Sequence, residues 1–477
     1  MTNAQTEPRA GRWPSQIKYI VGNEACERFS YYGMRSILAG YITGAVLKGG
    51  LGKDADTATG IIHIFIFVNY FMPLLGAWLS DKLIGRYHTI LWVSLFYCAG
   101  HGVLACSDWV GGVDAKLTFL YVGLALIAFG SGGIKPCVSA FVGDQFKPDQ
   151  AHLLQKAYGA FYWAINFGSF FSFLAIPWIK DRWGFSLAFG VPGILMAMAT
   201  LIFWLGTPHY VRVPPSRQTQ TAGFFKIFWH ALLTRRAPGQ PFWDTALGRF
   251  SSREVDAAKS VPPILFVFML IPAFWTLFDQ TNSTWVLQGQ AMASVKLWGM
   301  TIGAEQMQSV NPVLVLLLVP LLTLTVYPRI GKLAAPLRRM AAGMFLGAIS
   351  YLVVAAIQLR LEHGEQLCVL LQLIPYLVLT AAEVLISTTG LEFAFREAAP
   401  EMKSIIMSFW LLTIAVGNLF VAGITKLLGG SGAGAHSSAV SASRFLLYAG
   451  MTFAVAVLFS LVSRTYRYRD EAAARGA

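Results

Sequence analysis

Residues 22–35 read Gly-Asn-Glu-Ala-Cys-Glu-Arg-Phe-Ser-Tyr-Tyr-Gly-Met-Arg, and they place charges inside the first segment that is long enough to cross a bilayer. With 3.6 residues per helical turn, Glu24, Arg28, Tyr31 and Arg35 fall on one face of a helix. Each central charge costs a membrane helix about 2.5–3.5 kcal/mol, so we expect this polar face to line a water-filled cavity where the charges pair. The alternative is an internal ion-pair cluster that only fixes helix packing.

The composition is typical of a polytopic membrane protein. Hydrophobic residues make up 55% of the 477 and charged residues only 13%, whereas a soluble domain has about a quarter charged residues. The net charge of +13 does not indicate a nucleic-acid partner, because most of the 37 Lys and Arg fall in segments on one side of the predicted membrane. This positive-inside bias predicts that both termini are cytoplasmic.

Hydropathy predicts twelve spans in two sets of six. The first set lies near residues 17–46, 58–83, 87–107, 116–143, 157–179 and 184–206, and the second near 261–292, 304–330, 336–359, 366–394, 402–428 and 443–465. Two sets joined by a basic loop predict two repeats around a central site. The expected parts are a cytoplasmic tail (1–16), a six-helix bundle (17–206), a cytoplasmic linker (207–260), a second six-helix bundle (261–466) and a cytoplasmic tail (467–477). In the linker, Phe224 to Leu233 predict either a short interfacial helix or a plain connection.

Three stretches resemble one family of transporters. Glu24-x-x-Glu27-Arg28-Phe29-x-Tyr31-Tyr32-Gly33 is similar to the first-helix signature of the proton-dependent oligopeptide transporter family (POT or PTR), a branch of the major facilitator superfamily. Residues 161–169 resemble the second signature of that family. Residues 76–89 resemble the superfamily loop between spans 2 and 3, in which Asp81 and Arg86 would brace neighbouring helices or take part in gating. The resemblance implies an all-α polytopic membrane protein with the major facilitator fold, in which twelve transmembrane helices form two six-helix bundles (6+6) related by pseudo-two-fold symmetry.

Four charges within the predicted spans form two pairs of matched depth. Arg35 and Asp279 fall toward the periplasmic half, and Lys135 and Glu383 toward the cytoplasmic half. Spans 1 and 7 correspond in the two repeats, as do spans 4 and 10, so both pairs respect the internal symmetry. We expect the pairs Arg35–Asp279 and Lys135–Glu383 to act as gates that close alternately.

The resemblance also implies the substrate, which would be a di- or tripeptide. Arg35 and Lys135 would face the peptide carboxylate and Glu383 the amine, while Asn166 and Asn311 would bind the backbone or the termini. The other substrate-binding residues that we expect are Tyr31, Tyr70, Trp275, Ser387 and Trp410. Without the resemblance, ordinary packing explains each aromatic residue as well.

Proton coupling is expected from acids on the first span and from one histidine. The candidates are Glu24, Glu27, Arg28, His63 and Asp279. The spacing of His63 before Tyr70 resembles that of animal peptide transporters, where the histidine is linked to proton coupling. The alternative for a lone histidine in an apolar stretch is a purely structural role.

The chain departs from the family pattern after the acid of span 10. The family usually has Ser-Pro-x-Gly there, whereas this chain reads Ser387-Thr388-Thr389-Gly390. The missing proline removes an obligatory break in the helix.

The sequence favours a proton-coupled peptide symporter over the other classes that we considered. A family member that carries another small anion such as nitrate is the alternative, although a simple anion has no amine for Glu383 to bind. We find no catalytic residues, no metal site and no haem ligands within the spans, so we do not expect an enzyme or a cofactor. A receptor or sensor would usually carry an appended soluble domain. The expected partners are peptides, protons and membrane lipid, without nucleic acid, for a monomer in the inner membrane.

Overall fold

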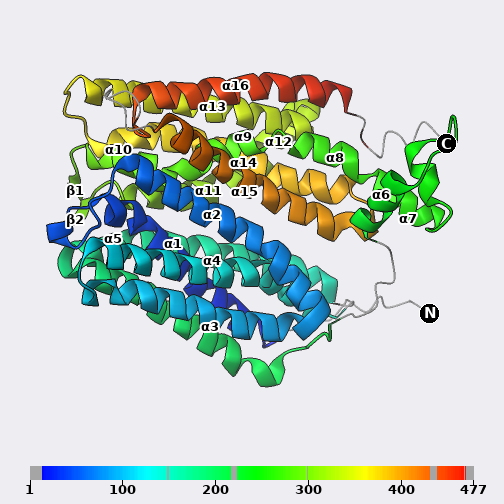
Figure 1. The fold of residues 1–477 in the computed structure, drawn as a ribbon, viewed down its shortest axis with the longest axis horizontal. Helices are drawn as coiled ribbons and strands as arrows, with labels where there is room; N and C mark the ends of the chain where they lie inside the picture. The colour runs from blue at the N-terminus through cyan, green and yellow to red at the C-terminus, as the bar shows by residue number, and fades with distance from the viewer. Residues whose placement is uncertain are drawn as a thin grey trace, which may run out of the picture. The chain divides into compact units, whose positions relative to one another are not determined.

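The structure is a computed structural model that describes residues 13–147, 150–215, 223–297, 299–429, 438–466 and 468. The predicted tails 1–16 and 467–477 lie outside these residues except for 13–16 and 468. The described chain is almost entirely helical (Figure 1). Its contacts separate it into two compact units, one made of residues up to Arg35 and Met72–Arg217, the other of Ser36–Phe71 and Gln218–Ala477.

The first unit is built around α3 (Gly85–Ala105), which packs against both α4 (Val113–Asp144) and α5 (Ala151–Leu205). It also contains the part of α1 (Ile17–Thr43) up to Arg35. The 55-residue α5 is two helices joined at Gly184, whose φ of 84° only glycine adopts readily. This break lies at the predicted start of span 6.

The second unit has α13 (Pro336–Glu362) between α14 (Leu373–Glu397) and α16 (Ala442–Thr465), as Figure 1 shows. Most of α2 (Ala55–Trp78) and all of α15 (Lys403–Leu428) also belong to it. Large aromatic side chains fill its core, among them Trp285, Tyr351 and Tyr376, none of which is more than 2% exposed.

Eight helices in the described part of the chain are long and apolar enough to cross a membrane. Two of them, Ala55–Trp109 and Leu153–His209, are 55 and 57 residues long, and each supplies two spans because about 20 residues cross a bilayer. A bent helix pair supplies one more span. The remaining span is α1, which is long enough but carries the charges of residues 22–35.

The predicted span over 261–292 is a bent helix pair. The segment divides into α8 (Val261–Phe268), α9 (Pro272–Phe278), η7 (Asp279–Asn282) and α10 (Thr284–Gln290), with a bend of 44° between Ser252–Phe268 and Pro272–Gln290. The bend has a direct cause, because Pro272 has no N–H to donate to the carbonyl of Phe268.

The predicted span over 304–330 lies within one apolar helical segment, Gln306–Ile330, whose helix type changes along its length. The segment runs through η8 (Gln306–Ser309), α11 (Val310–Leu321), a π-helical turn η9 (Leu322–Val326) and α12 (Tyr327–Ile330). The π-helical turn follows Pro320, which again lacks a backbone donor. A two-stranded antiparallel hairpin, β1 (Val295–Leu297) and β2 (Met300–Ile302), precedes this segment and was not predicted.

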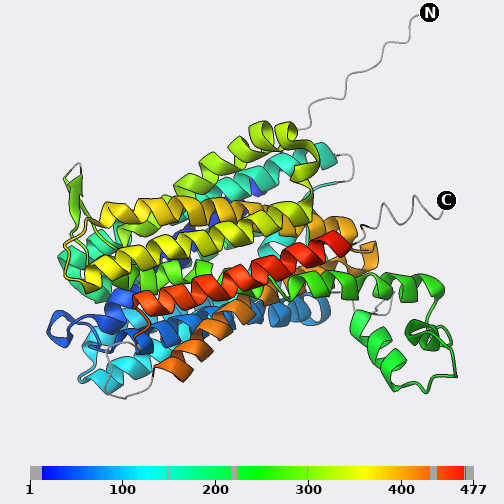
Figure 2. The same cartoon turned by 90° about the horizontal axis from the view of Figure 1, so that it is seen from above.

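The described part of the linker contains two α-helices. The alternative of an interfacial helix is favoured, since α6 spans Phe224–Leu233. A capping box formed by Ser251 and Glu254 starts α7 (Ser252–Lys259). In Figures 1 and 2 this segment projects beyond the end of the long helices α13 and α16. The remaining short helical turns are η1 (Val46–Lys48), η2 (Leu79–Ile84), η3 (Cys106–Trp109), η5 (Thr207–His209), η6 (Phe242–Ala246), η10 (Gly331–Ala334), η11 (Val369–Gln372) and η12 (Pro400–Met402).

Candidate functional site

The two acids of α1 share one guanidinium. Arg28 Nε lies 2.8 Å from Glu24 Oε1 and 2.5 Å from Glu27 Oε2, and the Ser131 hydroxyl lies 3.5 Å from Glu27 Oε1. None of the three charged side chains is more than 7% exposed. The predicted grouping of these charges is therefore correct. Two carboxylates against one guanidinium leave one negative charge in excess, and a single proton removes it.

Close contact between α1 and α5 holds these charges in place. A Cβ on Gly168 would lie 2.6 Å from the carbonyl oxygen of Ala25 and 3.0 Å from the backbone nitrogen of Phe29. Only glycine allows the two backbones to approach so closely. The glycine of the second signature therefore allows α5 to pack closely against the part of α1 that carries the first signature.

Three cations surround the buried ring of Tyr31. The Lys135 ammonium lies 5.0 Å from the ring centroid, and the guanidinium carbons of Arg35 and Arg28 lie 5.7 and 5.9 Å from it. Tyr31 is only 1% exposed. The negative face of an aromatic ring attracts cations, so the two residues predicted to face a carboxylate share one aromatic partner.

Asn166 of α5 belongs to the first unit. Its Nδ2 donates to the carbonyl of Tyr162 at 2.9 Å. This bond within the helix uses one of the two N–H donors of the amide, so the second N–H and the side-chain oxygen of Asn166 can still bond to a ligand.

Glu383 is held by an amide in the second unit. Asn311 Nδ2 donates to Glu383 Oε2 at 2.7 Å and also contacts the Thr380 hydroxyl at 3.1 Å. Ser387 lies one helical turn beyond Glu383, and its buried hydroxyl has no hydrogen-bond partner among the described residues. The buried Nε1 of Trp275 has no partner there either. These two groups are therefore available to a polar ligand.

The aromatic residues of this unit pack closely around α14. The rings of Trp275 and Trp410 are 6.4 Å apart and nearly perpendicular. A Cβ on Gly390 would lie 2.1 Å from the Trp410 ring, so that position requires glycine. Tyr70 packs against the apolar core. In the absence of the family's proline, α14 continues unbroken through Thr388.

His63 is the centre of a buried hydrogen-bonded chain in the second unit. Its Nδ1 lies 2.7 Å from Asn418 Oδ1, its Nε2 lies 2.8 Å from the Ser283 hydroxyl, and Asn418 Nδ2 donates to Asp279 Oδ2 at 2.7 Å. All four side chains are at most 3% exposed.

The proton positions in this chain follow from the chemistry of its groups. An ionised Asp279 only accepts, so Asn418 must donate to it and must accept from His63 Nδ1. Neutral His63 then accepts at Nε2 from Ser283, whereas protonated His63 donates there. A change in the protonation of His63 therefore reverses the direction of the bond to Ser283.

Sequence reasoning missed Asn418 and Ser283. Asn418 lies two helical turns after Trp410, and it is a single amide in an otherwise apolar part of α15. A lone polar residue in a membrane helix is a signal of function or of interhelical bonding, so this position could have been recognised from the sequence.

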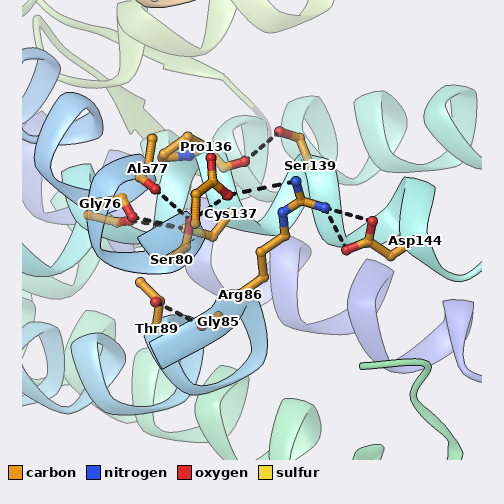
Figure 3. Close-up of polar contacts among 12 residues, drawn as sticks. Gly76, Ala77, Ser80, Gly85, Arg86, Thr89, Pro136, Cys137, Ser139 and Asp144 are labelled. Carbon is orange, nitrogen blue, oxygen red and sulfur yellow. Dashed lines mark hydrogen bonds and ion pairs between the residues drawn. The ribbon is translucent and has the colours of Figure 1, made fainter. Parts of the chain in front are cut away.

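A separate polar cluster joins α3 to the end of α4 in the first unit (Figure 3). Arg86 Nη1 donates to both carboxylate oxygens of Asp144 at 2.6 and 2.8 Å, and Arg86 Nη2 lies 3.8 Å from Asp81. Ser80 donates to the carbonyl of Ala77 at 3.0 Å and contacts Asp81 at 3.3 Å. The main partner of Arg86 is thus Asp144, which the sequence analysis did not single out.

The predicted gates remain predictions. Arg35 and Lys135 belong to the first unit, whereas Asp279 and Glu383 belong to the second. Each gate pair would join one residue from each unit.

Comparison with known proteins gives consistent matches. A family model described as PTR2, POT family, matches residues 87–433. Solute carrier family 15 member 2 of Homo sapiens is 36% identical over 369 residues, which cover 74% of this chain and 50% of the relative. Peptide transporter family 1 of Drosophila melanogaster is 39% identical over 368 residues, covering 74% and 48%. The chain thus spans about half the length of the curated relatives that it matches.

Solved structures match over nearly the whole chain. The crystal structure of an auto-inhibited POT family peptide transporter has a TM-score of 0.87 at 38% identity and covers 95% of this chain and 98% of that one. The in meso crystal structure of the POT family transporter PepTSo has a TM-score of 0.85 at 37% identity, with 96% and 99% covered. The predicted helical membrane fold is confirmed, and the chain is a multi-pass membrane protein. The signatures, the fold and the matched sequences agree, and the chain belongs to the POT family.

Proposed function

We propose that this chain is a proton-coupled symporter that imports di- and tripeptides across the inner membrane by alternating access, with both termini in the cytoplasm. The observation that carries the proposal is the placement of Arg35 and Lys135 at the single ring of Tyr31. Two cations at one buried ring suit a ligand carboxylate. The names of the human and fly relatives, a solute carrier and a peptide transporter, support this reading.

The other end of the peptide would bind the second unit. Glu383, oriented by Asn311, provides an anion for the peptide ammonium. The hydroxyl of Ser387 and the indole nitrogen of Trp275 are buried and can donate to the peptide backbone. Tyr70 and Trp410 would form apolar walls that tolerate different side chains. An inorganic anion such as nitrate would bind only to Arg35 and Lys135, because it has no ammonium group for Glu383.

The proton would be carried by the charges of α1 and by the His63 chain. One proton that moves down 100 mV supplies about 2.3 kcal/mol, enough for a roughly fiftyfold concentration gradient. The excess negative charge at Glu24, Glu27 and Arg28 suits a group that takes up one proton in one state of the transport cycle. The Arg35–Asp279 and Lys135–Glu383 pairs would open and close alternately. Their movement would couple proton uptake to the exposure of the peptide site on one side of the membrane and then on the other.

The direct test is uptake of a labelled dipeptide by proteoliposomes with and without an inward pH gradient. We expect accumulation only with the gradient, competition by unlabelled di- and tripeptides, and none by nitrate or free amino acids. Competition by nitrate but not by peptide would favour the anion alternative.

The coupling residue is tested by Glu27→Gln, which mimics the protonated acid. We expect this variant to lose accumulation driven by the pH gradient and to keep exchange of peptide for peptide, which needs no net proton movement. Glu365→Gln, in the loop before α14, is the control and should keep both activities. If Glu27→Gln concentrates peptide as well as the parent does, the coupling role passes to Glu24, Asp279 or His63.

A further inference from the structure

The helix α6 buries one of its faces in the second unit. Phe224, Ile227 and Ala231 follow the helical spacing i, i+3, i+7 and are at most 5% exposed. Phe224 stacks on Phe228 at 5.6 Å and also contacts Trp243 of η6. This face explains how α6 is attached, but it accounts for only part of the apolar surface of the helix.

A second apolar face of α6 is left exposed by the protein. Phe225, Trp229, Leu232 and Leu233 lie on it and are 50, 53, 47 and 80% exposed. Burial in protein does not explain these four large side chains, and contact with water would be unfavourable. In Figure 2, α6 runs across the direction of α13 and α16 of the same unit, so its axis follows the plane of a membrane that those helices cross.

The exposed face is continuous with a groove between membrane-spanning segments. The ring of Phe225 lies 5.9 Å from that of Phe409 on α15. Phe409 lines a groove of about 390 Å³ between α15 and the bent segment α8–α9. Other lining residues are Leu265, Phe268, Met269, Leu412 and Phe420. The one hydroxyl of the lining, that of Thr413, donates to the carbonyl of Trp410. The groove therefore has the character of a site for an alkyl chain.

Cations adjoin this apolar surface. Lys226 follows Phe225 on α6, and Arg235 and Arg236 follow the end of the helix, all three exposed. Two other cations of this segment are neutralised, since Arg253 pairs with Glu401 at 2.6 Å and Lys259 with Asp256 at 3.2 Å. A ten-residue helix is about 15 Å long, so Lys226 and the arginine pair reach different headgroups.

We propose that α6 and the groove between α8–α9 and α15 form a binding site for an anionic phospholipid of the leaflet on this side of the membrane. One acyl chain lies in the groove, and the phosphate of its headgroup contacts Lys226. The apolar face of α6 sits at the boundary between headgroups and acyl chains, where Arg235 and Arg236 meet neighbouring anionic headgroups. The groove borders the bend between α8 and α9. The lipid therefore contacts the part of this span where the regular backbone hydrogen bonds of the helix are interrupted.

The test is native mass spectrometry of the full-length protein with phosphatidylglycerol or phosphatidylcholine of identical acyl chains. We expect phosphatidylglycerol to be bound preferentially, by roughly fivefold for each basic residue that meets a headgroup. The charge-reversed variant Lys226→Glu/Arg235→Glu/Arg236→Glu should lose this preference. The matched control is Lys48→Glu/Lys53→Glu/Lys296→Glu, which makes the same change in net charge around η1 and β1, at the other end of the second unit.

Two further variants keep the test decisive. Lys226→Gln changes a single exposed side chain and should weaken the preference if the triple variant is not monodisperse. Leu412→Trp fills the groove and should reduce binding of the first lipid while the charges stay in place. Equal binding of both lipids by the parent protein would overturn the proposal. So would the same loss in the control triple variant, or unchanged binding by Leu412→Trp.

Discussion

Replacing Asn418 by leucine should destabilise the second unit, because this amide joins His63 to Asp279. The substitution keeps the branched shape of the side chain and removes two hydrogen bonds of 2.7 Å to other segments, together with a bond of 2.9 Å to the carbonyl of Ile414 within α15. Hydrogen bonds to charged groups in soluble proteins contribute about 1.5–3 kcal/mol. Bonds between membrane helices contribute less, about 0.6 kcal/mol on average and at most about 1.7, because the unfolded chain in the membrane also finds partners. The membrane value applies here, so the expected loss is about 1–3 kcal/mol in the free energy of unfolding.

The measurement is a reversible unfolding titration in mixed micelles for Asn418→Leu, Asp279→Asn and the double variant. Since the amide bonds directly to Asp279, the second substitution should cost less in the background of the first, by about 0.6–1.7 kcal/mol. Thr389→Val is the control. Its buried hydroxyl has no hydrogen-bond partner among the described residues, so the loss should stay within about 0.5 kcal/mol. Additive effects of Asn418→Leu and Asp279→Asn would refute the bond between these residues.

Three further predictions address other parts of the molecule. Lys135→Ala should abolish dipeptide uptake and leave the protein monodisperse in detergent, and near-normal uptake would remove Lys135 from the substrate site. Gly76→Leu should disrupt the crossing of α2 and α4, since a Cβ at Gly76 would lie 2.1 Å from the carbonyl oxygen of Gly133. We expect the free energy of unfolding to fall by more than about 3 kcal/mol, which size-exclusion chromatography would show as aggregation. The control Gly60→Leu, with no atom within 4 Å of its added Cβ, should behave as the parent. Asp54→Ala should lower the free energy of unfolding by about 0.5–1 kcal/mol at neutral pH. The Asp54 carboxylate accepts from the Thr57 backbone N–H at 2.7 Å, which lowers the pKa of Asp54 below its ordinary 3.8. This stabilisation is present above pH 3.8 and is lost as the pH falls through the lowered value, so a constant difference down to pH 2 would contradict it.

Much of the fold followed from the sequence alone, because membrane insertion depends on local composition. About 20 apolar residues cross a bilayer whatever their neighbours are, so the number of spans could be read from hydropathy. The face of α1 that carries Glu24, Glu27 and Arg28 could also be predicted, because helical periodicity places residues of one helix without knowledge of any other. The breaks at Pro272 and after Pro320 had local causes and could have been recognised from those prolines.

Contacts between separate helices required the tertiary structure. The convergence of Arg35 and Lys135 on Tyr31 depends on how α4 is rotated against α1. The bond from Asn418 to His63 joins residues 355 positions apart. Neither composition nor periodicity contains the rotation of one helix relative to another, since that rotation is set by close packing at positions such as Gly168 and Gly390. The sequence by itself therefore determined which charges enter the membrane, and the tertiary structure decided which partners they meet there.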